Sequence, residues 1–306
     1  MPNTILKVDN LKKHYPTVKA VDGISFEISK GTVFTLLGPN GAGKTTTLEI
    51  IEGIKNSDDG EIEFFGEKMK HVTRDAKERM GVSLQSTNFI PHLKVREVFE
   101  LFASLFKKNL PVDEVIGFVS LEEKKNDLVE KLSGGQKQRV AIGCALINDP
   151  DMIFLDEPTT GLDPQARRNI WDIVNHLKKE GKTIFLTTHY MEEAQELSDV
   201  VCIMDHGKII AMGTPAEHIK RLGERNYIEF KAKLIPEEIR ELNSWDVEEV
   251  EVEDDNVIIP TKELHSILEK LLSWANEKGM SLNDISIRQP NLEDVFLSLT
   301  GRRLRD

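Results

Sequence analysis

The feature of the sequence that most constrains the fold is a glycine-rich segment between an apolar run and a helical pattern. Residues 38–45 read GPNGAGKT and fit the spacing G-x-x-x-x-G-K-[ST]. The apolar run 32–37 before them is predicted to be a strand, and a helix is expected to begin near Lys44. Later strand and helix patterns extend this order into an open α/β sheet, whose ligand should lie at the carboxyl ends of the strands.

The same segment predicts a phosphate-binding loop. Glycines let successive backbone N–H groups curl around phosphates, Lys44 supplies positive charge to the β and γ oxygens, and Thr45 offers a hydroxyl to Mg²⁺. A plain glycine-rich turn is the alternative, and the placement between strand and helix weakens it. The residues expected to contact nucleotide here are Gly38, Pro39, Asn40, Gly41, Ala42, Gly43, Lys44, Thr45 and Thr46. We therefore expect ATP and Mg²⁺ as cofactors.

Two carboxylates follow a second buried run. Residues 152–155 are short, uninterrupted and apolar, as in a parallel strand buried on both faces, and Asp156 and Glu157 come directly after them. We expect Asp156 to hold the Mg²⁺ shell and Glu157 to orient and partly deprotonate the attacking water. Without the phosphate loop, this pair would more often belong to a solvated turn. Its combination with that loop favours the catalytic interpretation.

His189 closes the next apolar run, residues 183–187, which is separated from the previous one by a helical pattern at 165–179. This order of strand, helix and strand brings His189 to the same edge of the sheet, where it could bond the γ-phosphate. A lone histidine at the end of a strand is usually just a satisfied polar residue. The functional interpretation of His189 therefore depends on the neighbouring motifs.

Residues 132–136, Leu-Ser-Gly-Gly-Gln, followed by KQRVAIGCAL, resemble the signature of ATP-binding cassette (ABC) proteins. The local sequence indicates only that Ser133, Gly134 and Gly135 leave backbone N–H groups open at the start of a helix, as in a second anion-binding site. A glycine turn that caps a helix is the alternative. The resemblance covers about residues 4–222 and implies an ABC-type nucleotide-binding domain, with a mixed sheet and a helical subdomain at about 86–150.

The resemblance also implies a composite site. Two such domains, either two copies or this chain and a related ATPase, would associate head to tail, and the signature of one would cover the γ-phosphate bound by the other. Tyr15 looks like the aromatic residue that stacks on adenine, Gln85 like the glutamine linking the metal site to the helical subdomain, and Asp163 like the end of the loop between the two sites. The implied catalytic residues are Glu157, His189, Lys44 and Gln85, the implied metal ligands are Thr45, Gln85 and Asp156, and the remaining implied nucleotide contacts are Ser133, Gly134, Gly135, Gln136 and Asp163.

The segments outside the nucleotide site indicate which kind of cassette protein this is. The stretch 86–131 is long enough only for the compact helical subdomain that, in transport ATPases, receives a short helix of a separate membrane permease. The ending PNLEDVFLSLTG, residues 290–301, is similar to the tail of ATPases that serve ABC-2 type exporters, although it could also be an ordinary packed helix. We expect an ATPase subunit that energises such an exporter. A soluble ATPase acting as a nucleotide-controlled clamp on a macromolecule is the alternative.

Composition bears on partners and location. The apolar runs fall far short of the roughly 20 residues needed to cross a bilayer, and the start of the chain lacks the pattern of a secretory signal. We therefore expect a cytoplasmic protein, held at the inner face of the cell membrane through its permease. A net charge of -12 makes nucleic acid an unexpected partner. Cys144 and Cys202 lie in apolar stretches and are predicted to be reduced core residues.

Residues 223–306 are predicted to form a separate, acidic α+β domain after the nucleotide-binding domain 1–222. Residues 264–275 have one apolar helical face, and 256–259 and 282–287 look like strands. A final helix is expected at 292–299, with Asn291 as its cap and Gly301 as its stop. The first domain should close with a hairpin at 200–210 and a helix at 214–222.

Overall fold

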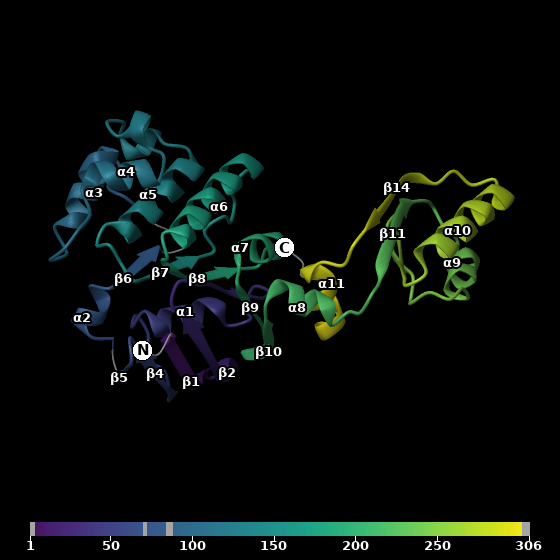
Figure 1. The fold of residues 1–306 in the computed structure, drawn as a ribbon, viewed down its shortest axis with the longest axis horizontal. Coiled ribbons are helices and arrows are strands. Elements are labelled where there is room, and N and C mark those ends of the chain that lie inside the picture. Colours follow the sequence, from purple (N-terminus) through teal and green to yellow (C-terminus); the bar gives the residue numbers. More distant parts are fainter. Residues whose placement is uncertain (1–3, 70–71, 84–87, 302–306) are drawn as a thin grey trace. The chain divides into compact units, whose positions relative to one another are not determined.

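A computed structural model describes residues 4–69, 72–83 and 88–301 of the chain (Figure 1). Contacts divide it into two compact units, one extending to Pro215 and the other beginning at Ala216. The domain boundary expected from the sequence, between residues 222 and 223, stays a prediction. Within the described ranges, no helix has both the length and the apolar character that a membrane crossing requires.

The first unit is built on a six-stranded sheet in which the strands are parallel except at one edge. Its strands, in spatial order, are β10 (Lys208–Gly213), β9 (Val200–Asp205), β3 (Val33–Leu37), β8 (Thr183–Thr188), β7 (Met152–Asp156) and β6 (Met80–Ser83). Strands β3, β7 and β8 are buried along their whole length, which agrees with their uninterrupted apolar sequences. The α/β class and the parallel strands predicted from the sequence are confirmed.

An antiparallel sheet packs against this sheet within the same unit. Its strands, in spatial order, are β2 (Val18–Ser29), β1 (Thr4–Tyr15), β4 (Asp59–Phe64) and β5 (Glu67–Met69). The ring of Phe26 on β2 stacks on Phe34 of β3 at 5.0 Å between centroids, and Phe34 lies 5.5 Å from Phe185 of β8. These buried rings join the two sheets in one core, and β2 thereby lies beside the loop that follows β3.

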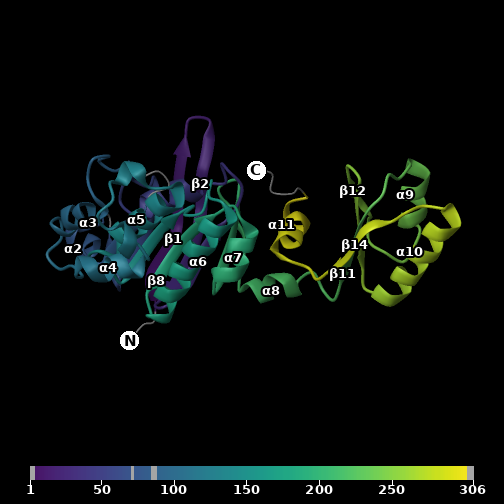
Figure 2. The same cartoon turned by 90° about the horizontal axis from the view of Figure 1, so that it is seen from above.

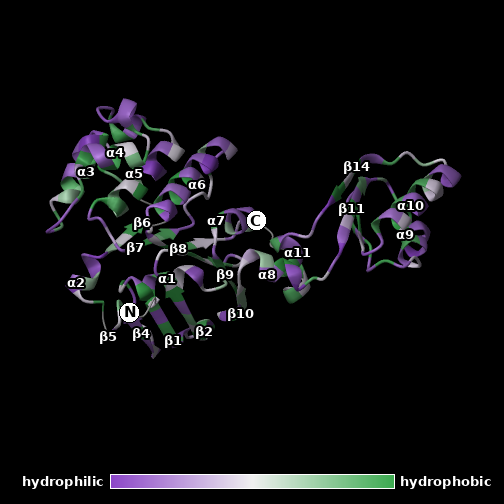
Figure 3. Ribbon diagram, in the orientation of Figure 1, coloured by the Kyte–Doolittle hydropathy of each residue, from purple (hydrophilic) through white to green (hydrophobic). Residues whose placement is uncertain are grey.

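Helices complete the first unit. They are α1 (Lys44–Ile51), α2 (Arg74–Lys77), α3 (Val95–Ala103), α4 (Val112–Phe118), α5 (Gly134–Leu146), α6 (Pro164–Lys179) and α7 (Met191–Leu197), with short 3₁₀ turns at Glu122–Lys124 and Val129–Lys131. Helices α3, α4 and α5 lie together in Figures 1 and 2 and share one apolar core, as expected for the helical subdomain. Hydrophilic residues cover much of α6 in Figure 3, while its other face buries Ile170, Val174 and Leu177.

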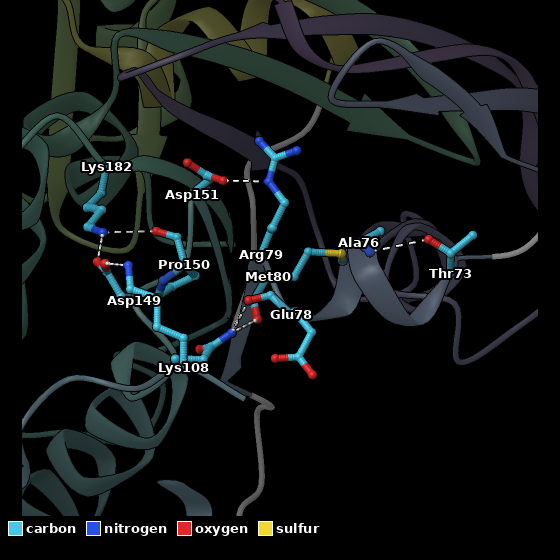
Figure 4. A network of polar contacts seen from close by, with 11 residues as sticks. Thr73, Ala76, Glu78, Arg79, Met80, Lys108, Asp149, Pro150, Asp151 and Lys182 are labelled. Atoms are coloured by element: carbon cyan, nitrogen blue, oxygen red, sulfur yellow. Dashed lines mark hydrogen bonds and ion pairs between the residues drawn. The ribbon is translucent and has the colours of Figure 1, made fainter. Parts of the chain in front are cut away.

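A polar network fixes the amino-terminal ends of the parallel strands (Figure 4). The side-chain amide of Asn148 donates to the carbonyl oxygens of Glu78 and Met80, which ties the loop that follows α5 to the start of β6. Lys182, just before β8, donates to Asp149 and to the carbonyl oxygen of Pro150. These contacts lie at the opposite end of the strands from the phosphate-binding loop, so they set the strand register without entering the site.

The second unit pairs a four-stranded antiparallel sheet with helices. Its elements are α8 (Pro215–Lys220), which begins at the junction, β11 (Asn226–Lys231), α9 (Pro236–Asn243), β12 (Glu251–Glu253), β13 (Asn256–Thr261), α10 (Leu264–Lys278), β14 (Asn283–Arg288) and α11 (Leu292–Thr300). The sheet order is β12-β13-β11-β14. Asn291 caps α11 by accepting from the N–H groups of Glu293 and Asp294, and Gly301 ends it with φ of 68°, as predicted. The predicted helix at 214–222 is shorter in the structure.

Candidate functional site

The segment between β3 and α1 closes into a tight loop. Its glycines are required by neighbouring backbone: a Cβ atom at Gly38 would lie 2.2 Å from the carbonyl oxygen of Met204, and one at Gly43 would lie 2.1 Å from that of Ala20. Gly43 also has φ of 107°, a conformation that other residues rarely adopt. Strands β9 and β2 therefore hold the loop from two sides.

Lys44 begins α1 and is 4% exposed. Its Nζ atom donates to the carbonyl oxygens of Gly38, at 2.8 Å, and Pro39, at 3.1 Å. Since both acceptors belong to the loop itself, the ammonium group lies inside the curve of the backbone. Thr45 and Thr46 follow in the first turn of the helix and line the adjoining cleft.

The two predicted carboxylates lie at the end of β7. Asp156 is the last residue of the strand, and Glu157 turns the chain with φ of 45°, in the left-handed region. The N–H of Glu157 donates to both the carbonyl oxygen and the Oγ1 atom of Thr187 on β8, each at 3.0 Å. The Thr187 hydroxyl in turn donates to Asp156. Thr187 thus orders both acidic residues, a role that the sequence analysis missed.

Three predicted catalytic residues meet at the side chain of Glu157. Its Oε1 atom lies 3.2 Å from the Nζ of Lys44, and its Oε2 atom lies 3.2 Å from the Nδ1 of His189. The hydroxyl of Thr160 donates to the same Oε2 atom at 3.2 Å. Strands β3, β7 and β8 are adjacent, so residues far apart in sequence come together at their carboxyl ends.

The electrostatics of this cluster follow from burial and from its cations. Burial by itself would raise the pKa of Glu157, but Lys44 and His189 hold that pKa below its usual value. Burial raises the pKa of Asp156, and the negative charge of Glu157 adds to this effect. Burial also lowers the pKa of Lys44, which Glu157 partly offsets. Glu157 is therefore ionised and able to accept a proton or a hydrogen bond from a neighbouring water.

A cleft of about 450 Å³ adjoins the loop. Tyr15 lines it with 40% of its surface exposed, so its ring is accessible to a ligand. Val18 and Ala20 of β2 also line the cleft and were not predicted, because apolar residues on an alternating strand look like ordinary core positions. The lining residues are Tyr15, Val18, Ala20, Asn40, Gly41, Gly43, Lys44, Thr45, Thr46 and Glu157.

The signature segment forms the start of α5. The Ser133 side chain accepts from the N–H of Gln136 at 3.3 Å, and the Gln136 side chain accepts from the N–H of Ser133 at 2.9 Å. The expectation of an open N–H at Ser133 is therefore wrong in this structure, because this capping box engages it. Gly134 is exposed, and the signature residues are not among the described residues that line the cleft.

The remaining predicted residues lie near α6 or outside the described ranges. The Asp163 carboxylate caps α6 by accepting from the N–H of Ala166 at 2.9 Å. A Cβ atom at Gly135 would lie 2.7 Å from the Cβ of Ala166, so the starts of α5 and α6 touch. Gln85 lies outside the described residues, and its predicted role stays a prediction.

The sequence matches one protein family and is similar to individual known proteins. A family model described as ABC transporter matches residues 21–160. Over 309 residues the chain is 40% identical to a Nod factor export ATP-binding protein I from Ralstonia nicotianae, covering 99% of this chain and 95% of the relative. It is 36% identical to the linearmycin resistance ATP-binding protein LnrL from Bacillus subtilis, covering 99% and 100% of the two chains.

A solved structure is also similar to this chain. It is the dimeric, post-hydrolysis state of an ATP-binding cassette bound to ADP and phosphate. This structure is similar with a TM-score of 0.62 and 27% identity, over 69% of this chain and 98% of the other. The similarity to the two export and resistance proteins, in contrast, extends through the second unit as well.

Proposed function

The chain belongs to the ATP-binding cassette family of transporter ATPases, and from this premise we propose that it energises a membrane exporter of the ABC-2 type by ATP-dependent, head-to-tail dimerisation. The observation that carries the hydrolytic part is the meeting of Lys44, Glu157 and His189 within 3.2 Å contacts at one sheet edge. The export part is supported by relatives with export or resistance names that match almost the whole chain.

Nucleotide binding is assigned to the cleft beside the phosphate-binding loop. The Tyr15 ring, at 40% exposure, stacks on adenine, with Val18 beside it. The loop amides and the first turn of α1 take the phosphates, and Lys44 turns from its present acceptors toward the β and γ oxygens. These assignments add Val18 and Ala20 of β2 to the nucleotide contacts predicted from the sequence.

The residues present fit a Mg²⁺ ion that accompanies the nucleotide. Mg²⁺ binds proteins through one or two carboxylates together with substrate phosphates and water, and the donors here are the Asp156 carboxylate and the Thr45 hydroxyl, with Gln85 as the predicted third. No cluster of three or more acidic, histidine or cysteine ligands occurs in the described part of the chain. The bound ion would neutralise phosphate charge and help to orient the γ-phosphate.

Hydrolysis is assigned to Glu157 and His189. The ionised Glu157 carboxylate orients the attacking water and accepts its proton, while the His189 imidazole contacts the γ-phosphate. In the proposed dimer, the Ser133 to Gln136 segment of one cassette covers the γ-phosphate bound to the other, and Asp163 lies between the two sites. Loss of the γ-phosphate would remove the contacts that favour the closed dimer.

A separate permease is the proposed partner at the helical subdomain. Ile90 is 56% exposed there, and Leu101 and Leu105 are 45% and 64% exposed. Exposed large apolar side chains are typical of docking surfaces, and we infer that a short permease helix would cover these. Such docking would hold this ATPase at the inner face of the membrane. The relatives' names favour this assignment over a soluble clamp.

The substitution Glu157→Gln tests the catalytic assignment. We expect it to retain ATP binding, to lower hydrolysis by a factor of about 100 or more, and to trap a dimer, because the amide cannot accept the proton of the water. Solution mass should double on addition of Mg²⁺ and ATP, as measured by light scattering. The exposed Glu180→Gln variant is the control and should hydrolyse ATP like the unaltered protein. A monomeric, fully active Glu157→Gln protein would refute the role of Glu157.

A further inference from the structure

Helix α6 holds the segment that carries His189 through two side chains one turn apart. The guanidinium carbon of Arg167 lies 4.5 Å from the centroid of the Tyr190 ring, within the range of a cation–π contact. The indole N–H of Trp171 donates to Oε1 of Glu193 at 3.1 Å. Arg167 and Trp171 are four residues apart and so lie on the same face of the helix. That face therefore contacts the chain on both sides of residue 191.

The contact continues from Tyr190 to the catalytic cluster. The centroids of the Tyr190 and His189 rings are 4.1 Å apart, and the N–H of Tyr190 donates to the Thr188 hydroxyl at 2.9 Å. His189 Nδ1 lies 3.2 Å from Oε2 of Glu157. An unbroken series of contacts thus runs from Arg167 through Tyr190 and His189 to Glu157.

Charge and burial favour this placement of Arg167. Glu193 is fully buried, and Glu192 lies at 4.0 Å from the Arg167 guanidinium. Burial raises the pKa of Glu193, and the hydrogen bond from Trp171 and the charge of Arg167 oppose that rise only in part. A planar, permanently charged group suits a position between acidic residues and an aromatic ring better than an ammonium group would.

We propose that Arg167 and Tyr190 are positioning residues for ATP hydrolysis, which act by holding the His189 imidazole against Glu157. This inference rests on the roles assigned above to His189 and Glu157. Asp163 caps α6 four residues before Arg167, so a displacement of the loop between Glu157 and α6 is carried to His189 through one rigid helix. The stack of Arg167 on Tyr190 and of Tyr190 on His189 should therefore affect the rate of hydrolysis and leave the cleft that binds nucleotide unchanged.

Two substitutions in the full chain test the stack. Arg167→Met keeps the length of the side chain but removes the planar cation, and Tyr190→Leu removes the ring. We expect each to lower kcat about tenfold and to change KM less than about twofold, since a stacked cation is worth on the order of one factor of ten. Tyr190→Phe retains the ring and should recover most of the activity lost in Tyr190→Leu. Arg168→Met, at the exposed next position of α6, is the matched control.

If Arg167 acts only by placing His189, the effects of substituting the two residues on kcat are not additive. Combining Arg167→Met with His189→Ala should lower kcat no further than His189→Ala alone, because both remove the same placement. If His189→Ala lowers kcat but Arg167→Met and Tyr190→Leu do not, the inference is overturned while the proposed function stands. If His189→Ala has no effect, the proposed role of His189 itself fails. Should Arg167→Met not fold, the comparison of Tyr190→Phe with Tyr190→Leu decides the question: equal rates would overturn the inference.

Discussion

Glu52 follows α1 directly, and its carboxylate is buried with 4% of the residue exposed. Among the described residues, no hydrogen-bond partner lies within reach of either carboxylate oxygen. Burial, with Asp156 and Glu49 as negative neighbours, raises its pKa to about 8 from a usual 4.5. Glu52 is therefore neutral at neutral pH. The sequence analysis did not select it, since a glutamate at the end of a helix is ordinarily solvated.

The raised pKa of Glu52 predicts that stability is lost as the pH rises from about 4.5 to about 8. Because the folded state binds the proton more tightly than the unfolded state, stability is full below about pH 4.5 and falls as the pH rises toward about 8. Glu52→Gln should remove this dependence and raise the free energy of unfolding at pH 9 by on the order of a few kcal/mol. Urea denaturation of nucleotide-free protein at pH 6 and 9 measures it. The exposed Glu67→Gln variant should leave the pH dependence intact, and the same slope in Glu52→Gln would contradict the assignment.

Single residues of the site were predictable where a spacing rule applies to them. Lys44, Glu157 and His189 each follow a buried strand, and parallel strands that are adjacent in space bring their carboxyl ends together. Thr187 and Val18 could not be selected in the same way. Their contribution depends on which residue of the neighbouring strand or loop they face, and that register is a tertiary property.

At the level of elements, α5 approaches α3 as closely as it does because residue 143 is glycine. A Cβ atom there would lie 2.6 Å from two ring atoms of Phe99 and 3.3 Å from Cγ1 of Val115 on α4. A glycine in the interior of a helix is otherwise unfavourable by about 1 kcal/mol relative to alanine. Packing of the three helices therefore outweighs helix propensity at this position.

Gly143→Ala should accordingly destabilise the helical subdomain, by about 1–3 kcal/mol, although alanine is the better helix former. The matched variant is Gly117→Ala on α4, where the nearest atom to the new Cβ is 3.9 Å away. It should be neutral or stabilising by up to about 1 kcal/mol. Denaturant unfolding of the two variants compares them directly, and equal stabilities would show that Phe99 can move aside.

Sequence patterns missed β11, whose charged residues form ion pairs with a neighbouring strand. Strand β11 contains Glu229 and Lys231, and its polar appearance hid a central strand of the second sheet. In the structure Glu229 pairs with Arg288 and Lys231 pairs with Asp284, both on β14. Helix α10 was predictable because its apolar face repeats within the segment itself.

At the scale of the whole molecule, the two units have separate apolar cores. A substitution in one core should therefore destabilise that unit and not the other. The core of the second unit includes Leu271, which is fully buried, and Trp274, whose ring meets Trp245 edge to face at 6.1 Å. The full-length similarity to export proteins includes this unit, but the sequence could not assign it a chemical role.

Leu271→Ala should destabilise the second unit by about 2–5 kcal/mol and leave ATP hydrolysis at moderate temperature unchanged. Hydrogen exchange measured by mass spectrometry should show lost protection within residues 226–288 and little change in β3, β7 and β8. Leu272→Ala is the control, since Leu272 is 49% exposed and its truncation leaves no cavity. Equal loss of protection in both units would contradict the predicted domain division.

The order of the central sheet has a consequence for biosynthesis. Strand β8 lies between β3 and β7, although the ribosome makes it after both. Until β8 has emerged, the nascent chain carries two apolar strands whose facing edges lack their shared partner, a state that invites misassembly or chaperone binding. Thr187, which orders Asp156 and Glu157, arrives on that same late strand. An incomplete chain can thus carry the phosphate-binding loop before Thr187 is present to order Asp156 and Glu157.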